Sequence, residues 1–410
     1  MDHFILMKIL LLTDYYPPES NAPALRCSYH AEYWVKKGHE VTVLTCAPNF
    51  PNGVLYEGYK NKLMSTSEVN GVNVVRCWSF ISKNEGFIMR IFDHLSSAIM
   101  FSIVPIFMKR PDVVIATSPQ FLTLISGYIS SSLIRRPLVS EIRDMWPEGI
   151  IFLSSKSIIY KILENIELFL YRRSSKIITV TSSFAKNISA RAGVSEKNIS
   201  ISYNGCNDYF QRSELKISNL KKKLNLEAKF VVGYAGTVGI SHGLDTLVSG
   251  FKEIDPSLNA HMIIIGSGAM HSQLKSFVKE KNIKNILILD AVPKNEIDHY
   301  LSLFDVCLVS LKDVPAYDKV IPSKLFEAAV HNKPVIAGLR GESRLIVEKY
   351  RIGEVFHPEN ASSFIDKLSS IILNLQNDSN FYQSGLKKVR QEFSRDRQAQ
   401  VVLDCIKGIK

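Results

Sequence analysis

The sequence lacks the features that mark several large classes of protein. Its six cysteines are scattered and form no CxxC pair. We therefore expect reduced thiols, and neither a zinc site nor a disulfide framework. No DxD motif occurs, so no acidic metal-ligand cluster is expected. No apolar run reaches the ~20 residues that cross a membrane: segment 121–134 is too short, and Arg90, Asp93 and His94 interrupt segment 86–108.

Charge is present in excess of one sign, without a concentrated block. The chain of 410 residues has 50 Lys+Arg against 39 Asp+Glu, a formal net charge of +11. The basic residues are spread along the chain, which argues against a nucleic-acid-binding tail. A basic protein of this kind favours anionic small molecules or acidic lipid surfaces as partners. The opening ILMKILLLT resembles a signal peptide, but Lys8 interrupts it and no small-residue cleavage site follows, so we expect a buried first strand there.

Short apolar runs alternate with helical segments along the whole chain. Because the runs are apolar at successive positions, they predict parallel strands covered on both faces. A first series of strands is expected at 8–13, 40–45, 72–78, 112–116, 138–142, 176–180 and 199–202, and a second at 230–235, 260–265, 285–289, 305–310 and 334–337. Two such series predict two doubly wound α/β domains. We place these at residues 1–205 and 206–392, with a last helix at 393–410 that packs back on the first domain.

The stretch GTVGISHG, residues 236–243, follows the first strand of the second series. Gly236 and Gly239 allow a tight turn and a close approach of the backbone to a ligand. The helix that begins after Gly243 offers free N–H groups to an anion. A phosphate-binding loop and an ordinary strand-to-helix turn are both compatible with this stretch alone.

The stretch VIPSKLFEAAVHNKPVIAG, residues 320–338, combines a lysine and a carboxylate at the start of a short helix. Pro322 favours a helix start, which places Ser323 and Lys324 in the first turn. There a lysine and N–H groups can hold a phosphate, and Glu327, one turn later, can accept hydrogen bonds from ribose hydroxyls. The alternative is a simple Lys–Glu helix pair.

Several stretches together resemble family 4 glycosyltransferases of the GT-B fold, in which two Rossmann-like domains face a cleft. These stretches are KILLLTDYYPPESNAPALR, GHEVTVLT, EIRDMWPEG, YNGCN, VVGYAGTVGISHGLDTL and PSKLFEAAVHNKPVIA. The branch most similar to this chain is the group of L-fucosaminyltransferase-like enzymes of bacterial O-antigen and capsule assembly. The resemblance implies a nucleotide sugar in the second domain, an acceptor in the first, retention of anomeric configuration, and no metal or other cofactor.

Site residues follow from the same resemblance. It implies that Glu327 binds ribose, that Lys324 and the backbone amides from Ser323 to Leu325 bind the diphosphate, and that Gly236 and Thr237 bind the distal phosphate. Gly239 belongs to the same glycine loop. The resemblance also implies that Asn21 lies on the acceptor side of the cleft.

The chain departs from the family pattern at three places. Lys319 stands where the first of two glutamates is usual, so we expect Lys319, Lys324 and Arg143 to meet the charge of the diphosphate. Thr237 and His242 occupy the places of an arginine and a lysine after the glycine loop. Arg143-Asp144 replaces a His-Asp pair in the first domain. We expect Arg143 to steady a phosphate or the acceptor, and Asp144 either to orient an acceptor hydroxyl or to cap its own turn.

The sequence therefore predicts transfer of a sugar, with N-acetyl-L-fucosamine as a candidate, from a UDP-sugar to a polyprenyl-diphosphate-linked saccharide. We expect a cytoplasmic protein, peripheral at the inner face of the bacterial plasma membrane, in O-antigen, lipopolysaccharide or capsule biosynthesis. Basic pairs at 109–110, 135–136 and 172–173 close apolar segments and favour an anionic lipid surface; ordinary sheet-covering helices are the alternative, which we prefer for 121–134.

Three other functions are compatible with parts of this pattern. A nucleotide-sugar 2-epimerase shares the architecture but needs carboxylates or histidines that abstract a proton from carbon. A nicotinamide-dependent dehydrogenase needs a complete G-x-G-x-x-G motif. TDYYPPESNAP after the first strand lacks it, and in IIIGSGAMHSQL, residues 263–274, His271 occupies the third glycine position, so we interpret that segment as a turn lining the cleft. A non-catalytic lipid-binding module would not need two phosphate-binding stretches.

Overall fold

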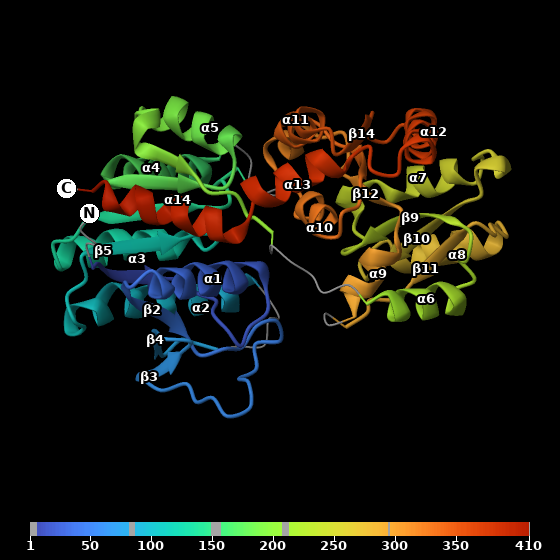
Figure 1. Ribbon diagram of the computed structural model, residues 1–410. Coiled ribbons are helices and arrows are strands. Elements are labelled where there is room, and N and C mark those ends of the chain that lie inside the picture. Colours follow the sequence, from blue (N-terminus) through green and yellow to red (C-terminus); the bar gives the residue numbers. More distant parts are fainter. Residues whose placement is uncertain (1–5, 82–86, 149–156, 207–212, 294–295, 410) are drawn as a thin grey trace. The chain divides into compact units, whose positions relative to one another are not determined.

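The computed structural model describes residues 6–81, 87–148, 157–206, 213–293 and 296–409. The chain divides into two compact units (Figure 1). Unit 1 comprises Met1–Asn204 with Arg395–Lys410, and unit 2 comprises Gly205–Ser394. The chain thus passes from unit 1 to unit 2 after Asn204 and returns to unit 1 after Ser394. The domain boundaries expected from the sequence, after residues 205 and 392, lie within two residues of these positions.

Unit 1 is built on an eight-stranded sheet in the order β3-β4-β2-β1-β5-β6-β7-β8. Its strands are β1 (Lys8–Leu12), β2 (Glu40–Cys46), β3 (Met64–Val69), β4 (Val72–Cys77), β5 (Val113–Thr117), β6 (Leu138–Ile142), β7 (Lys176–Thr179) and β8 (Ile199–Ile201). Only the β3–β4 pair is antiparallel among the pairs of described strands. The carboxyl ends of the parallel strands therefore meet at one edge, where α/β sheets bind ligands.

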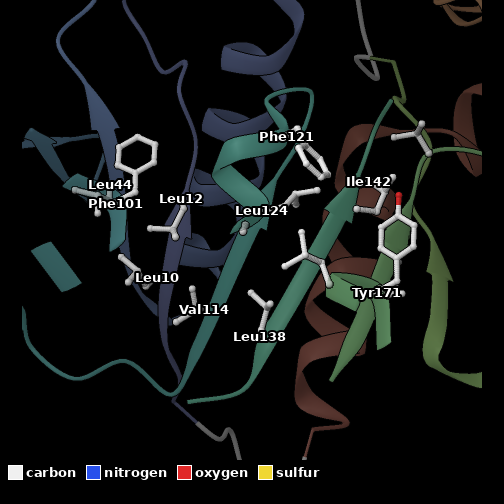
Figure 2. Close-up of a cluster of buried hydrophobic side chains, with 14 of the residues drawn as sticks. Leu10, Leu12, Leu44, Phe101, Val114, Phe121, Leu124, Leu138, Ile142 and Tyr171 are labelled. Carbon is white, nitrogen blue, oxygen red and sulfur yellow. The ribbon is translucent and has the colours of Figure 1, made fainter. Parts of the chain in front are cut away.

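Helices cover both faces of this sheet, which explains the continuous apolar runs. One face packs against α2 (Phe87–Ile103), the 3-10 helix η1 (Val104–Phe107), α3 (Phe121–Leu133), α4 (Ile158–Arg173) and α5 (Ser182–Ala192). Figure 2 shows side chains of this layer, among them Leu10 and Leu12 of β1 and Phe101 of α2. The alternate residues of β1, Ile9 and Leu11, face the opposite layer.

The opposite layer contains α1 (Ala22–Lys36) and α14 (Arg395–Lys407). The indole N–H of Trp34 in α1 donates to the carbonyl of Ala399 at 3.0 Å, and both residues are fully buried. The last helix of the chain is thus part of unit 1.

Unit 2 has a fully parallel six-stranded sheet in the order β11-β10-β9-β12-β13-β14. The strands are β9 (Phe230–Ala235), β10 (Ala260–Ile265), β11 (Ile286–Leu289), β12 (Val306–Ser310), β13 (Val335–Gly338) and β14 (Gly353–Phe356). The helices are α6 (Glu214–Lys223), α7 (Leu244–Phe251), α8 (His271–Glu280), α9 (Ile297–Leu303), α10 (Lys324–Val330), α11 (Gly341–Tyr350), α12 (Ala361–Asn377) and α13 (Gln383–Glu392). Short 3-10 helices lie at Glu196–Asn198 in unit 1 and at Ile240–His242, Pro256–Leu258 and Pro315–Lys319 in unit 2.

The prediction of two doubly wound α/β domains is confirmed, and two strands were missed. β3 escapes a search for apolar runs because most of its residues are exposed. It forms a hairpin with β4 through Asn70 and Gly71, which have φ of 51° and 79°, the positive values that favour Asn-Gly turns. β14 is short and only its last residue, Phe356, is buried, so it lacks the signature of a central strand.

Candidate functional site

In unit 2 the glycine-rich loop 236–239 continues β9 beyond the edge of the sheet. Gly236 N–H donates to Ile265 O and Val238 N–H to Ser267 O, both at 2.9 Å. A Cβ on Gly266 would collide with the Gly236 carbonyl, and one on Gly268 would lie 2.5 Å from the Val238 carbonyl. Gly266 and Gly268 thus allow the backbone of their turn to pack closely against loop 236–239. This packing explains the G-x-G sequence here without a dinucleotide-binding role.

Lys324, at the start of α10, lies directly on Gly236. A Cβ on Gly236 would be 2.9 Å from both Cε and Nζ of this lysine. The ammonium lies 5.0 Å from the ring centroid of Tyr234, a cation–π contact. Burial lowers the pKa of Lys324, with Glu327 acting in the opposite direction. A largely buried ammonium held by a ring face rather than by a carboxylate can accept an anion at the end of β9.

His242 completes the group around Tyr234. The two rings are 5.8 Å apart in an edge-to-face arrangement, and the Tyr234 hydroxyl donates to the carbonyl of Thr237 at 2.5 Å. Burial, followed by the charge of Lys324, lowers the pKa of His242 to about 4. The imidazole is therefore neutral near pH 7, and negative charge added nearby would favour its protonated form.

The remaining predicted residues on α10 have different surroundings. Glu327 is exposed, and its Oε1 accepts a hydrogen bond of 2.8 Å from the Ser323 hydroxyl. Leu325 is fully buried, and its N–H donates to Pro322 O at 3.2 Å. Leu325 thus anchors the helix, while the carboxylate of Glu327 is exposed and the ammonium of Lys324 lies against Tyr234 and Gly236.

Lys319 ends the 3-10 helix Pro315–Lys319, within the loop that leads to α10. Arg340 bonds both Asp313 and Asp318 of this loop. Gly341, with φ of 57°, packs against the Asp318 carbonyl so closely that no Cβ would fit. Arg340 and Gly341 therefore fix the loop that carries Lys319, and both lie outside the stretch 320–338 that stood out in the sequence.

In unit 1, Arg143 and Asp144 follow β6 at the carboxyl edge of the sheet. The Ser118 hydroxyl accepts hydrogen bonds from their backbone N–H groups, at 2.7 and 3.3 Å. The Nε and Nη1 atoms of Arg143 are buried and have no hydrogen-bond partner among the described residues. Asp144 keeps an exposed surface, but the protein around its carboxyl displaces part of the water there. This desolvation raises the pKa of the carboxyl, and the charge of Arg143 opposes the shift. Arg143 thus has donor capacity to spare for a ligand.

Buried charges behind this pair hold the end of β6 in place. Glu141 accepts 3.0 Å and 2.6 Å hydrogen bonds from Arg26 Nε and the Thr117 hydroxyl. Burial alone would raise the pKa of Glu141, but Arg26, His30 and Arg143 outweigh it and lower the value to about 2. The carboxylate is therefore charged at any physiological pH.

A second feature of unit 1, which the sequence reasoning missed, is a cavity beneath α2. Its volume is about 200 Å³. It lies beyond the ends of β1 and β2 and is lined by Asp14, Tyr15, Cys46, Asn49, Phe50, Asp93, His94 and Ser97. From the sequence, we used Asp93 and His94 only to argue that segment 86–108 does not cross a membrane. Their presence in an otherwise apolar segment was the signal that could have indicated a functional site.

The cavity combines carboxylates with aromatic rings. Asp14 Oδ2 lies 3.5 Å from His94 Nδ1, and its Oδ1 accepts from the Thr123 hydroxyl at 3.2 Å. The rings of Tyr15 and Phe50 meet edge to face, 5.4 Å between centroids. Burial, with Asp14 adding to it and His94 opposing, raises the pKa of Asp93 to about 6. Hydrogen-bond acceptors beside ring faces suit a polyhydroxylated ligand.

Asn21 has a structural position. It is the N-cap of α1, and its side-chain oxygen accepts a 2.9 Å hydrogen bond from Ala24 N–H. Capping accounts for an asparagine here without a ligand.

No group of three or more His, Cys, Asp or Glu side chains that could hold a metal ion occurs in the part of the chain that the structure describes.

Two family models match the chain, one for each unit. Residues 26–209 match Glycosyltransferase Family 4, and residues 216–388 match Glycosyl transferases group 1. Together they cover all but the two ends and a short connection.

Individual relatives are distant but match over most of their length. A protein of Escherichia coli (strain K12), WcaI, whose name describes a colanic acid biosynthesis glycosyl transferase, is 24% identical over 78% of this chain and 80% of its own. The crystal structure of Anabaena HepE in complex with UDP-glucose superposes with a TM-score of 0.67 at 17% identity, covering 98% of this chain and 99% of the other. WaaG, a glycosyltransferase involved in lipopolysaccharide biosynthesis, gives a TM-score of 0.63 at 13% identity, covering 98% and 100%.

The two models account for both units, and the neighbours share their fold. The chain therefore combines a region that matches Glycosyltransferase Family 4 with a region that matches Glycosyl transferases group 1, and it has the GT-B fold of the solved glycosyltransferase structures.

Proposed function

We propose that the protein transfers a glycosyl group from a UDP-sugar, bound by unit 2, to a hydroxyl of a polyprenyl-diphosphate-linked saccharide, bound by unit 1. The observation that carries the donor half is the ammonium of Lys324, held over Tyr234 and against Gly236. The complex of HepE with UDP-glucose supports a UDP-sugar as donor. The names of WcaI and WaaG support a role in bacterial surface polysaccharide assembly.

In this proposal unit 2 binds the nucleotide end of the donor. Lys324 pairs with the diphosphate, the open backbone of Gly236 and Thr237 approaches the distal phosphate, and Glu327 accepts hydrogen bonds from the ribose hydroxyls. Ser323 holds Glu327 in place by its 2.8 Å hydrogen bond. Departure of UDP leaves negative charge on the diphosphate, and the preorganised ammonium stabilises it without a metal ion.

We assign the sugar end of the donor to a loop of unit 2 rather than to individual contacts. Lys319 and the neighbouring loop would border it, and N-acetyl-L-fucosamine is our candidate on the resemblance of the sequence to L-fucosaminyltransferase-like enzymes. We also propose retention of anomeric configuration, on the same ground.

We assign the acceptor to the carboxyl edge of unit 1. The cavity beneath α2 would take the terminal sugar of the acceptor, with Asp14 and Asp93 accepting hydrogen bonds from its hydroxyls and the rings of Tyr15 and Phe50 packing on its apolar face. The unpaired N–H groups of Arg143 would bind a phosphate or another acceptor oxygen, and Asp144 would orient the attacking hydroxyl. A lipid-linked acceptor places the enzyme at the cytoplasmic face of the bacterial plasma membrane.

The test is to incubate the protein with a panel of UDP-sugars and a polyprenyl-diphosphate-linked saccharide, and to follow UDP release and the mass of the lipid product. We expect one sugar to be added, with full activity in excess chelator. Conversion of a UDP-sugar into its epimer without lipid product would instead identify an epimerase. Loss of activity in chelator and recovery with Mg²⁺ or Mn²⁺ would contradict the metal-free stabilisation of UDP.

A further inference from the structure

Helix α2 carries apolar side chains on the face that points away from the sheet. Ile91, Leu95, Ile99 and Ile103 follow one another at four-residue intervals, so they form a single stripe. Their exposed fractions are 39, 42, 58 and 45%. The opposite face of the helix packs on the sheet through Phe101 (Figure 2). An outward stripe of this length has no role in the core of unit 1.

The two helices beside α2 extend this apolar surface. α3 contacts both α2 and α4. On α3, Ile129 and Leu133 are 39 and 57% exposed; on α4, Ile158 and Ile162 are 74 and 53% exposed. We call the exposed apolar residues of α2, α3 and α4 the three-helix face. Segment 121–134 covers the sheet as expected, through Phe121 and Leu124, and the exposed end of α3 also belongs to this face. Exposed apolar side chains on three helices in contact, beyond the scattered ones that are normal on a surface, indicate an interaction site.

Positive charge lies at the ends of the same elements. Lys109-Arg110 follow η1, Arg135-Arg136 follow α3, and Arg172-Arg173 end α4. Arg135 and Arg173 are exposed, and Arg173 lies over the ring of Phe169. Lys109 pairs with Glu40 at 2.7 Å.

The described acidic residues of these helices are engaged elsewhere. Glu164 and Glu167 pair with Arg191 at 2.9 and 2.7 Å, and Asp93 lines the cavity beneath α2. The three-helix face therefore combines apolar side chains with a basic border, which complements an anionic lipid bilayer.

We infer that the three-helix face is a lipid-docking surface, on which α2 lies parallel to the bilayer with its apolar stripe between the headgroups. The apolar stripe inserts, and the basic border attracts anionic headgroups. No described helix is long and apolar enough to cross a membrane, which fits docking in the interface. The earlier expectation relied on the basic pairs; the structure adds the apolar stripe as the main contact.

If the proposed function holds, this docking geometry also explains how a lipid-linked acceptor reaches its cavity. Asp93, His94 and Ser97 of α2 line the cavity, on the side of the helix opposite to the stripe. One helix thus separates the bilayer from the proposed acceptor cavity by its own diameter, about 10 Å. The sugar of a lipid-linked acceptor can reach the cavity while its lipid stays in the bilayer.

The experiment measures partition of the full-length protein onto vesicles by flotation. Vesicles of phosphatidylethanolamine and phosphatidylglycerol are compared with vesicles of phosphatidylcholine, at low and high salt. The test variant is Ile99→Ser/Ile103→Ser, which removes apolar surface without changing charge. Its matched control is Leu345→Ser/Leu373→Ser on α11 and α12, where the exposed fractions are 63 and 54%. The charge variant Arg135→Gln/Arg173→Gln is matched by Lys222→Gln/Lys223→Gln on α6.

We expect the wild type to float with anionic vesicles and to be released only in part by salt. Ile99→Ser/Ile103→Ser should weaken partition by roughly tenfold or more at both salt concentrations, because apolar insertion is not screened. Arg135→Gln/Arg173→Gln should weaken it severalfold at low salt only. Both controls should behave like the wild type, and all variants should retain the wild-type melting temperature.

Three outcomes would overturn the inference. The first is that the wild type does not float with the vesicles, and the second is that Ile99→Ser/Ile103→Ser floats as the wild type does. The third is that the wild type is a dimer and Ile99→Ser/Ile103→Ser is a monomer, because the face would then be an interface between two copies of the chain. UDP binding, measured by calorimetry on the same samples, reports on the proposed function separately. Flotation without UDP binding would refute the proposed function alone, and UDP binding without flotation would refute the docking surface alone.

Discussion

The ammonium of Lys324 and the ring of Tyr234 form a cation–π contact, with Nζ 5.0 Å from the ring centroid. Tyr234 is in β9 and Lys324 begins α10, so the contact joins the end of one strand to a helix 90 residues later in the chain. Gly236 lies beneath the lysine and leaves room for its side chain. The contact holds a buried positive charge at the edge of the sheet, where an anionic ligand can bind it.

Lys324→Ala should weaken binding of UDP. The variant removes a charge-assisted hydrogen bond to the diphosphate, which costs about 1.5–3 kcal/mol, and isothermal titration calorimetry measures the change. Lys222→Ala on α6 is the matched control and should bind UDP as the wild type does. Unchanged affinity in Lys324→Ala would exclude this lysine from the nucleotide site.

Binding of a UDP-sugar should be accompanied by proton uptake at His242. In the free protein the pKa of His242 is about 4; a nearby diphosphate favours the protonated imidazole and raises that value. The complex then binds more protons than the free protein, so affinity should increase as the pH falls from neutrality. Calorimetry in buffers of different ionisation enthalpy measures the uptake, and the diester phosphates of a UDP-sugar do not themselves titrate in this range.

His242→Gln provides the comparison for this proton uptake. It should remove the uptake and flatten the dependence of affinity on pH, while the Lys324 contact remains. Equal proton uptake in the variant and the wild type would show that His242 does not sense the diphosphate.

Most of the fold was predictable because every central strand is covered on both faces. β10 (Ala260–Ile265) consists almost wholly of buried apolar residues, and this composition is visible in the sequence. β3 was not predictable in this way, because a strand at the edge of a sheet needs few apolar residues. Its hairpin turn, Asn70-Gly71, was the available signal.

The candidate site was predictable only where charge and glycine occur together in the sequence. Gly236 and Lys324 stood out for that reason. Tyr234 did not, because an aromatic residue in an apolar strand has the pattern of a core residue and nothing local shows that its ring faces a lysine. The cavity beneath α2 is formed by residues at the ends of β1 and β2 and by residues in the middle of α2. These segments are far apart in the sequence, so they come together only in the folded chain.

Asp93→Asn should change how stability depends on pH. The pKa of Asp93 is raised to about 6, above the ordinary value of about 3.9. A carboxyl with a raised pKa contributes stability below its ordinary value, and that contribution is lost as the pH rises through about 6. Between about pH 4 and 7 the wild type should therefore lose about 1–2 kcal/mol more unfolding free energy than Asp93→Asn.

Thermal unfolding of both proteins across this pH range, followed by calorimetry, measures the difference. Asp366→Asn, on the exposed part of α12, is a control that should follow the wild type. Parallel pH profiles for wild type and Asp93→Asn would mean that this carboxyl ionises in the cavity without cost.

Glu327→Gln should separate ribose recognition from helix structure. The substitution keeps the size and helix propensity of the side chain, and it replaces a charged acceptor with a neutral amide. The hydrogen bonds to the ribose hydroxyls should weaken, and the affinity for UDP should fall by about 1.5–3 kcal/mol, the range for hydrogen bonds to charged groups. Calorimetry with UDP and with its 2′,3′-dideoxyribose analogue measures the effect.

The analogue decides between the two roles of this carboxylate. It lacks both hydroxyls, so its affinity should change much less than that of UDP when Glu327 is replaced. Ser323→Ala removes the 2.8 Å hydrogen bond to Glu327 and should give a smaller loss with the same preference for UDP, because the carboxylate is then less well oriented. If Glu327 acts only through the charge of Lys324, both ligands should lose affinity slightly and equally. Equal losses would therefore remove Glu327 from the ribose site and leave Lys324 as the sole charged contact on α10 for the nucleotide.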